Sequence, residues 1–179
     1  PNDVGLNAEE IDFNLSNGES VTGWWLPPHG DNSVIMYFHG NGSAVYSNHD
    51  IYRDLNTQGY GVFGVGYVGY PGLSGLKDKP KQAAIVDAAV EQYDSLIEDG
   101  ISPDNIVFYG TSLGSGIAAQ LATMRKPAKL IMEAPFNSTL DIGRQSMPIF
   151  PVGLFMRDTY RSDLALAELA GARLHFRQV

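Results

Sequence analysis

The sequence contains no cysteine among its 179 residues. That absence excludes disulfides and thiolate metal sites, although it is compatible with any cellular compartment. Basic residues are also scarce, since 12 Lys and Arg stand against 20 Asp and Glu and the formal net charge is -8. Nucleic acid is therefore not expected as a partner, because phosphate binding needs clustered basic side chains and the sequence has no such cluster.

Long apolar runs are missing as well. No stretch approaches the roughly 20 apolar residues of a transmembrane helix, and no signal peptide is visible, so no membrane span is expected in this sequence. The first residue is Pro1 and not Met, so we expect part of the N-terminus to be missing, and any targeting segment or membrane anchor would be missing with it. Cytoplasmic and membrane-attached locations both stay open, and the oligomeric state is not indicated.

The rest of the composition is that of a folded globular protein. Hydrophobic residues make up 44% of the chain and charged residues 18%, which suits one globular domain over residues 1–179. Residues 10–15 alternate between apolar and polar side chains, as a half-buried strand does. Asn17-Gly18 is a hairpin turn signal, and residues 20–25 form the second strand of an expected antiparallel ribbon.

From residue 34 onward the pattern changes to short apolar strands that alternate with helices. Strands are predicted at 34–38, 60–65, 106–109 and 129–133, and helices at 47–58, 80–98 and 115–124. Such an alternation predicts a parallel sheet with helices on both faces. After Pro135 the pattern weakens, with a short helix at 164–170 and a possible strand at 172–179.

A serine stands between the third predicted parallel strand and its following helix. Gly110-Thr111-Ser112-Leu113-Gly114 matches the G-x-S-x-G pattern of a nucleophile elbow, a sharp turn that exposes the serine. Glycines are needed at both outer positions because side chains there would collide. The turn would present the Leu113 N–H, at the positive end of the helix, to an oxyanion.

Two other interpretations of this turn stay open. The serine can be idle in an ordinary glycine turn, or the glycines can bind a phosphate group. The second is disfavoured, because neither G-x-G-x-x-G nor a Gly-Lys pair before Ser or Thr is present here.

A second glycine motif, His39-Gly40-Asn41-Gly42, follows the strand predicted at 34–38 directly. Hydrolysis through a tetrahedral intermediate needs two backbone donors, and one of them comes from a loop after an early strand. The Asn41 N–H is the natural second donor. His39 is expected to brace the loop, since the catalytic histidine of this arrangement follows the serine in the chain.

These motifs together resemble the alpha/beta-hydrolase superfamily, and within it the serine-aminopeptidase-like and esterase-like hydrolases. The resemblance is carried by residues 23–27, 37–41, 69–75, 109–115 and 133–136. It implies a three-layer α/β fold with a mostly parallel twisted sheet, an N-terminal antiparallel ribbon, and final strands missing from this chain. It also implies a serine hydrolase for ester, thioester or amide bonds of small-molecule, peptide or acyl substrates, with no cofactor and no metal.

The chain departs from the resemblance in two places. Relatives often carry Asp-Tyr-Arg-Gly where this chain has Gly66-Tyr67-Val68-Gly69, and their Asp and Arg brace the next loop, so a less firmly held loop is expected here. Relatives also place the catalytic acid and histidine after later strands. Leu174-His175 resembles the end of the acid-bearing strand, so both groups are expected beyond Val179.

Residues within the chain are weaker candidates for these two roles. His175 is the only histidine after Ser112, and an acid between them would satisfy the order Ser, Asp, His. Asp163 is such an acid, as are Asp141 and Asp158. Glu133, at the end of its strand, is an alternative acid or a brace for the loop. A non-catalytic pseudo-hydrolase that binds partners on the same fold is the rival function.

Overall fold

The computed structural model describes residues 5–70, 81–135, 164, 165, 167 and 169. Its strands are β1 (Glu9–Asn14), β2 (Ser20–Leu26), β3 (Val34–Phe38), β4 (Gly61–Gly64), β5 (Ile106–Thr111) and β6 (Lys129–Glu133). Its helices are the 3-10 helix η2 (Val45–Asn48), α1 (His49–Thr57), α2 (Gln82–Glu98), the 3-10 helix η3 (Pro103–Asn105) and α3 (Leu113–Met124).

The described strands form one mixed sheet in the order β1-β2-β4-β3-β5-β6. β1 pairs with β2, and β2 with β4, in antiparallel orientation. β3 lies parallel to both β4 and β5, and β5 lies parallel to β6. The predicted mostly parallel sheet with an N-terminal antiparallel ribbon is therefore confirmed, and Gly18 supplies the positive φ of 84° that the hairpin turn needs.

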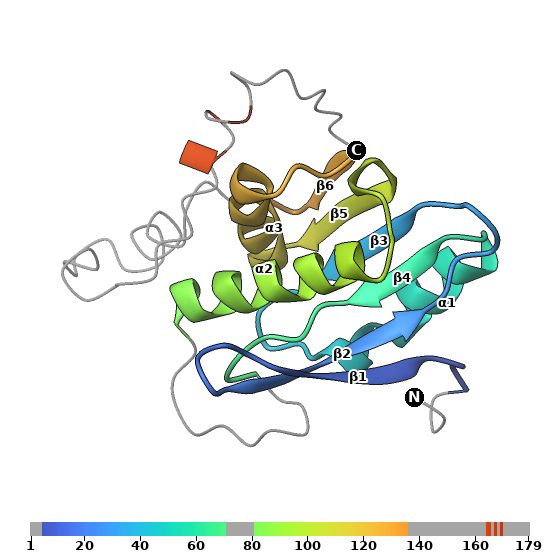
Figure 1. The fold of residues 1–179 in the computed structure, drawn as a ribbon, viewed down its shortest axis with the longest axis horizontal. Helices are drawn as coiled ribbons and strands as arrows, with labels where there is room; N and C mark the ends of the chain where they lie inside the picture. The colour runs from blue at the N-terminus through green and yellow to red at the C-terminus, as the bar shows by residue number, and fades with distance from the viewer. Residues whose placement is uncertain (1–4, 71–80, 136–163, 166, 168, 170–179) are drawn as a thin grey trace, which may run out of the picture.

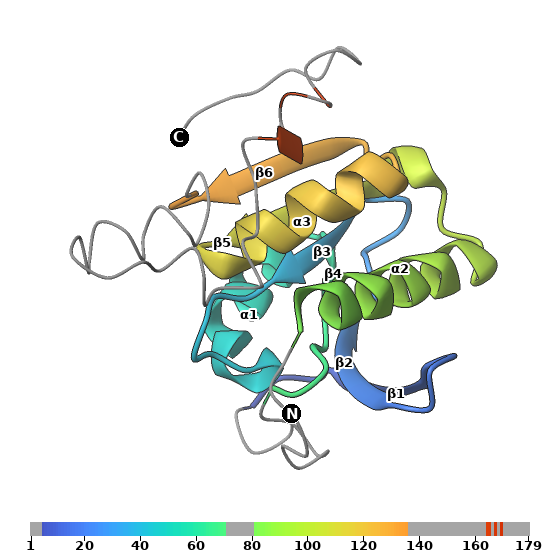
Figure 2. The same ribbon diagram turned by 90° about the vertical axis from the view of Figure 1, so that its left-hand side faces the viewer.

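Helices cover the sheet on both faces. Figure 1 shows α2 and α3 together on one face, and Figure 2 shows α1 on the opposite side of the strands. β3 is buried on both sides, as its continuous apolar sequence predicts. Met36 and Phe38 join the core under α2 and α3, while Tyr37 between them joins the core under α1.

The site-bearing elements begin and end somewhat differently from the sequence prediction. β5 continues to Thr111, and α3 begins at Leu113 instead of residue 115, so Ser112 alone separates them. The helix predicted at 47–58 is divided into η2 and α1. The direct passage from strand to helix makes the turn at Ser112 sharper than the sequence indicated.

Beyond residue 135, only residues 164, 165, 167 and 169 belong to the described structure, and all four are helical, as predicted. Leu169 is buried and joins the core under α2 and α3. The strand predicted at 172–179 lies outside the described residues. In the part of the chain that is described, no helix has the length and apolar character to cross a membrane.

Candidate active site

Ser112 occupies the single position between β5 and α3. Its backbone angles are φ 50° and ψ -116°, and besides Ala134 it is the only non-glycine residue with positive φ in the described ranges. Its N–H donates to the carbonyl of Glu133 at 2.9 Å, which extends the pairing of β5 with β6 by one residue. A strained conformation persists only where the surrounding structure enforces it, so the neighbouring residues must hold the backbone of Ser112 in this conformation.

Both glycines of the motif are required by close backbone packing. A Cβ added at Gly114 would lie 1.9 Å from the carbonyl oxygen of Phe38, and one added at Gly110 would lie 2.4 Å from the carbonyl oxygen of Gly114. Real Cβ atoms do not approach other atoms so closely. The steric reason that the sequence suggested for these glycines is therefore the one the structure shows.

The first turn of α3 is closed over the serine by Ser115. The backbone N–H and the buried side-chain hydroxyl of Ser115 both donate to the carbonyl of Ser112, at 2.9 and 2.5 Å. Leu113 is the first residue of the helix, and the first N–H groups of a helix have no partner within it. The Leu113 N–H is thus placed where an anion beside Ser112 would meet the positive helix end.

The 39–42 loop follows β3 and passes directly beside the serine. The position of a Cβ on Gly40 would be 3.6 Å from Ser112 Cβ and 3.5 Å from the carbonyl oxygen of Thr111. The loop turns back at Gly42, whose φ is 73°, and the Ser43 N–H donates to the Gly40 carbonyl at 3.3 Å. The structure therefore brings the two glycine motifs together, with Asn41 one residue from the contact.

His39 is buried beneath this loop. Its ring stacks on Tyr67 at 4.0 Å between centroids, and its Nδ1 lies 3.0 Å from the Gly40 carbonyl. Burial lowers the pKa of His39 to about 4, so the ring is neutral at pH 7 and Nδ1 carries the proton that Gly40 accepts. Its Nε2 is buried and has no hydrogen-bond partner among the described residues. These contacts agree with the bracing role expected for His39.

The loop is held by contacts that the sequence did not reveal. Tyr67 donates its hydroxyl to the His39 carbonyl at 3.0 Å, and Tyr70 donates to Asn41 Oδ1 at 2.9 Å. Gln92, fully buried on α2, accepts from the Gly66 N–H and donates to the Gly66 carbonyl, both at 2.9 Å. Gln92 thus fixes the backbone at Gly66. The glycine-rich loop that the sequence predicts to be less firmly held follows Gly69, and its residues 71–75 lie outside the described residues, so that expectation stays a prediction.

Glu133 lies beside the elbow at the end of β6, paired with Thr111 in the sheet register. Its Oε2 accepts from the Thr111 hydroxyl at 3.2 Å and from Tyr109 at 3.0 Å. The Thr111 hydroxyl has one hydrogen, which it donates to Glu133. Tyr37 must therefore be the donor in its hydrogen bond with Thr111, at 3.0 Å. Burial, followed by the bond to Glu133, raises the pKa of Tyr109 to about 12. These contacts fit a brace for the elbow.

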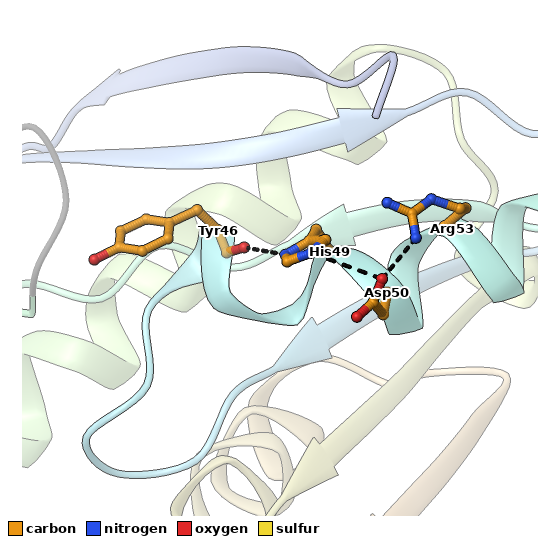
Figure 3. A network of polar contacts seen from close by, with 4 residues as sticks. All are labelled: Tyr46, His49, Asp50 and Arg53. Carbon is orange, nitrogen blue, oxygen red and sulfur yellow. Dashed lines mark hydrogen bonds and ion pairs between the residues drawn. The ribbon is translucent and has the colours of Figure 1, made fainter. Parts of the chain in front are cut away.

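A histidine and a carboxylate also meet on α1, after the 39–42 loop (Figure 3). His49 Nε2 lies 3.7 Å from Asp50 Oδ1, which is longer than a hydrogen bond, and Asp50 pairs with Arg53 at 2.6 Å. His49 Nδ1 lies 3.0 Å from the Tyr46 carbonyl. Asp50 is 74% exposed, so the group is a solvated network at a helix start and not an acid–base pair for Ser112.

The remaining candidates, His175, Asp141, Asp158 and Asp163, lie outside the described residues. Sequence reasoning missed Gln92 and Tyr70. A signal for Gln92 was present, since a glutamine interrupts the apolar face of the helix at 82–98 and a buried amide needs partners. Tyr70 carried no comparable signal. In the described ranges, no group of three or more His, Cys, Asp and Glu could hold a metal ion.

Comparisons with known proteins agree with this architecture. A family model for serine aminopeptidase, S33, matches residues 30–154. An uncharacterised protein of Mycobacterium tuberculosis is 28% identical over 157 residues, which are 87% of this chain and 55% of the relative. The lysophosphatidylserine lipase ABHD12 of Danio rerio is 30% identical over 112 residues, 59% of this chain and 28% of the relative. The chain thus spans about half the length, or less, of these curated relatives.

Solved structures support the fold. An esterase of Pyrococcus furiosus superimposes with a TM-score of 0.67 at 18% identity, and the match covers 98% of this chain and 66% of the esterase. At that identity the likeness concerns the fold alone. With a family model that spans most of the chain and an elbow between β5 and α3, the chain belongs to the serine aminopeptidase S33 family of the alpha/beta-hydrolase superfamily.

Proposed function

We propose that the protein is a serine hydrolase that cleaves ester, thioester or amide bonds, with Ser112 as the nucleophile. The observation that carries the proposal is the backbone of Ser112, held at φ 50° and ψ -116° between two glycines that no other residue can replace. Such strain is expected where it exposes a reactive hydroxyl. An idle serine or a phosphate-binding turn gives no reason for it.

In the proposed reaction, Ser112 Oγ forms a bond to the carbonyl carbon of the substrate, the π bond of the C=O group breaks, and its electrons move to the carbonyl oxygen, which becomes the oxyanion. The N–H groups of Leu113 and Asn41 donate to that oxyanion. The contact between Gly40 and Ser112, together with the position of Leu113 at the start of α3, supports this assignment. Two such donors are worth several orders of magnitude in rate, because each is aligned before the charge develops.

A histidine must take the serine proton and an acid must orient that histidine. Three of the four histidines lie before Ser112 and are accounted for as a buried brace or as surface residues. His175, with Asp163 or Glu133 as the acid, is the candidate within this sequence. The contacts of Glu133 with Tyr109 and Thr111 favour a bracing role for its carboxylate over an acidic one.

The rival proposal is a pseudo-hydrolase that binds a partner without chemistry. Its premise is that no base activates Ser112, and the candidate base His175 lies outside the described residues. Without a base, only residual catalysis from the oxyanion hole and from binding is expected. The two proposals therefore differ in the reactivity of the serine.

A fluorophosphonate probe separates them. We expect the folded protein to gain one adduct, located at Ser112 by peptide mass analysis, and the Ser112→Ala variant to gain none. An unlabelled, folded protein would favour the pseudo-hydrolase. His175→Gln shows whether the base lies in this sequence, since labelling falls steeply only if His175 activates Ser112.

Substrate class follows from a second assay, on protein that has not been treated with the probe. The relatives include a lysophosphatidylserine lipase and a serine aminopeptidase family, so p-nitrophenyl esters, lysophosphatidylserine and aminoacyl p-nitroanilides form the test panel. Turnover of the esters without the anilides would assign an esterase or lipase, and the reverse would assign a peptidase. Ser112→Ala is the control for each substrate.

A further inference from the structure

The 66–70 segment, Gly66 to Tyr70, begins two residues after the end of β4 and packs against the 39–42 loop. Three rings form the contact: His39 stacks on Tyr67, and Tyr70 meets both edge to face, at 5.6 and 5.3 Å between centroids. Two hydroxyls of this segment donate to the loop. Tyr67 bonds the His39 carbonyl and Tyr70 bonds the side chain of Asn41.

The segment itself is anchored from both sides. Gln92 forms two hydrogen bonds with the Gly66 backbone. Its amide nitrogen also donates to the Ala88 carbonyl at 3.0 Å, so the buried amide is fully paired. On the other side, a Cβ at Gly66 would lie 2.5 Å from the Thr22 carbonyl oxygen. The backbone at Gly66 is therefore fixed between β2 and α2, so Tyr67 and Tyr70 follow an anchored point of the chain.

Asn41 needs such an external partner. Asparagine side chains readily bond backbone N–H groups nearby in the chain, and this competes with the conformation of a short loop. The Tyr70 hydroxyl lies 2.9 Å from Asn41 Oδ1 and satisfies that oxygen. Burial raises the pKa of Tyr70, so its hydroxyl is a donor throughout the neutral range.

We propose that Tyr70 is a positioning residue that acts through the Asn41 side chain to hold the Asn41 N–H as the second oxyanion donor. This inference rests on the proposed function, and it adds a residue outside both glycine motifs to the catalytic apparatus. Tyr70 does not touch the reacting atoms. Its contribution is the fixed direction of a donor, which matters because a misplacement of about 1 Å can cost about 100-fold in rate.

The test compares Tyr70→Phe with Tyr60→Phe in the whole protein. Tyr70→Phe removes only the hydroxyl and keeps the ring contacts with His39 and Tyr67. Tyr60 is an exposed tyrosine at the far end of β4, so its variant controls for the loss of a hydroxyl elsewhere. Fluorophosphonate labelling gives two constants, the affinity of the first encounter and the rate of phosphonylation, and thermal unfolding reports stability.

We expect Tyr70→Phe to slow phosphonylation by about 10- to 100-fold with the encounter constant unchanged within about twofold. Tyr60→Phe should match the unsubstituted protein in both constants. A merely structural role for Tyr70 would instead lower the unfolding temperature and leave the phosphonylation rate of the folded fraction unchanged. A wild-type rate in folded Tyr70→Phe overturns the inference, while the proposed function stands.

If the unsubstituted protein is not labelled, the proposed function fails and the inference is judged by amide hydrogen exchange. The Asn41 and Gly42 amides should then exchange faster in Tyr70→Phe than in Tyr60→Phe, because the loop has lost its external partner. Equal exchange in the two variants overturns the inference. The two failures are thus separated, since one concerns the reactivity of Ser112 and the other the order of the 39–42 loop.

Discussion

Ser112 combines two demands that oppose each other. Its backbone adopts φ 50° and ψ -116°, which an L side chain rarely takes, yet it must carry a side chain to supply a nucleophile. The Ser112 N–H bonded to Glu133 and the Ser112 carbonyl bonded twice to Ser115 enforce the conformation. Stability is therefore sacrificed at one residue, and the surrounding hydrogen bonds offset that cost.

Replacing Ser112 by two small residues measures this strain. Both Ser112→Ala and Ser112→Gly lose the hydroxyl, but only glycine takes the observed φ without a Cβ clash. Relief of about 1–3 kcal/mol of strain, less about 0.5–1 kcal/mol for the greater freedom of unfolded glycine, should leave Ser112→Gly about 1 kcal/mol more stable than Ser112→Ala. Urea unfolding checks this. Equal stability of the two variants would contradict a strained serine.

At the scale of elements, the elbow depends on how closely α3 approaches β3. The carbonyl oxygen of Phe38, the last residue of β3, would lie 1.9 Å from a Cβ on Gly114. The N-terminus of α3 is thereby set against the strand end from which the 39–42 loop departs. This helix–strand contact, together with the pairing of Phe38 with Gly110 in the sheet, keeps the two halves of the proposed oxyanion hole close together.

Gly114→Ala should therefore cost at least about 3 kcal/mol, because the methyl group meets backbone that cannot rotate away. Gly100→Ala is the matched control. Gly100 follows the C-cap of α2 with φ 91°, and nothing lies within 4 Å of an added Cβ, so only backbone strain of about 1 kcal/mol is expected. Chemical unfolding of both variants gives the comparison. A similar cost at the two positions would mean that α3 can shift away from β3.

A separate prediction concerns Gln92 on α2, whose buried amide bonds the backbone of Gly66 just after β4. Gln92→Leu keeps the volume but leaves the Gly66 N–H and carbonyl buried without partners, which should cost about 2–4 kcal/mol. Gln58→Leu, at an exposed helix end, should stay within about 0.5 kcal/mol. Urea unfolding distinguishes the two. A small effect at Gln92 would show that Gly66 finds other partners.

The elements could be predicted from the sequence because each carries a local pattern. The five apolar residues 34–38 form β3 with the predicted ends, and the elbow follows from glycines whose spacing has a steric cause. The brace of the 39–42 loop could not be predicted in this way. Gln92 and Gly66 are 26 residues apart and Tyr70 and Asn41 are 29 apart, so only the folded sheet brings them together.

At the scale of the whole molecule, stability depends on pH through groups that the fold has buried. His39 is enclosed by the sheet, the 39–42 loop and Tyr67, and its exposed fraction is 0%. A charged imidazole there would lose its hydration without gaining a carboxylate partner from the described part of the chain, where its Nδ1 bonds the Gly40 carbonyl and its Nε2 has no partner. The folded protein therefore resists protonation at this residue.

Burial lowers the pKa of His39 from 6.5 to about 4, so as pH falls the unfolded chain binds this proton first. The contribution to stability is complete above pH 6.5, falls between pH 6.5 and 4, and then levels off. Over that range the free energy of unfolding should drop by about 3 kcal/mol on account of His39 alone.

Urea unfolding between pH 7 and 4 measures this drop, and in His39→Gln the part of the drop that comes from His39 should be absent. His29→Gln, at an exposed position, should retain it. An imidazole signal of His39 that titrates near pH 6.5 in the folded protein would contradict its assignment as a neutral, buried brace.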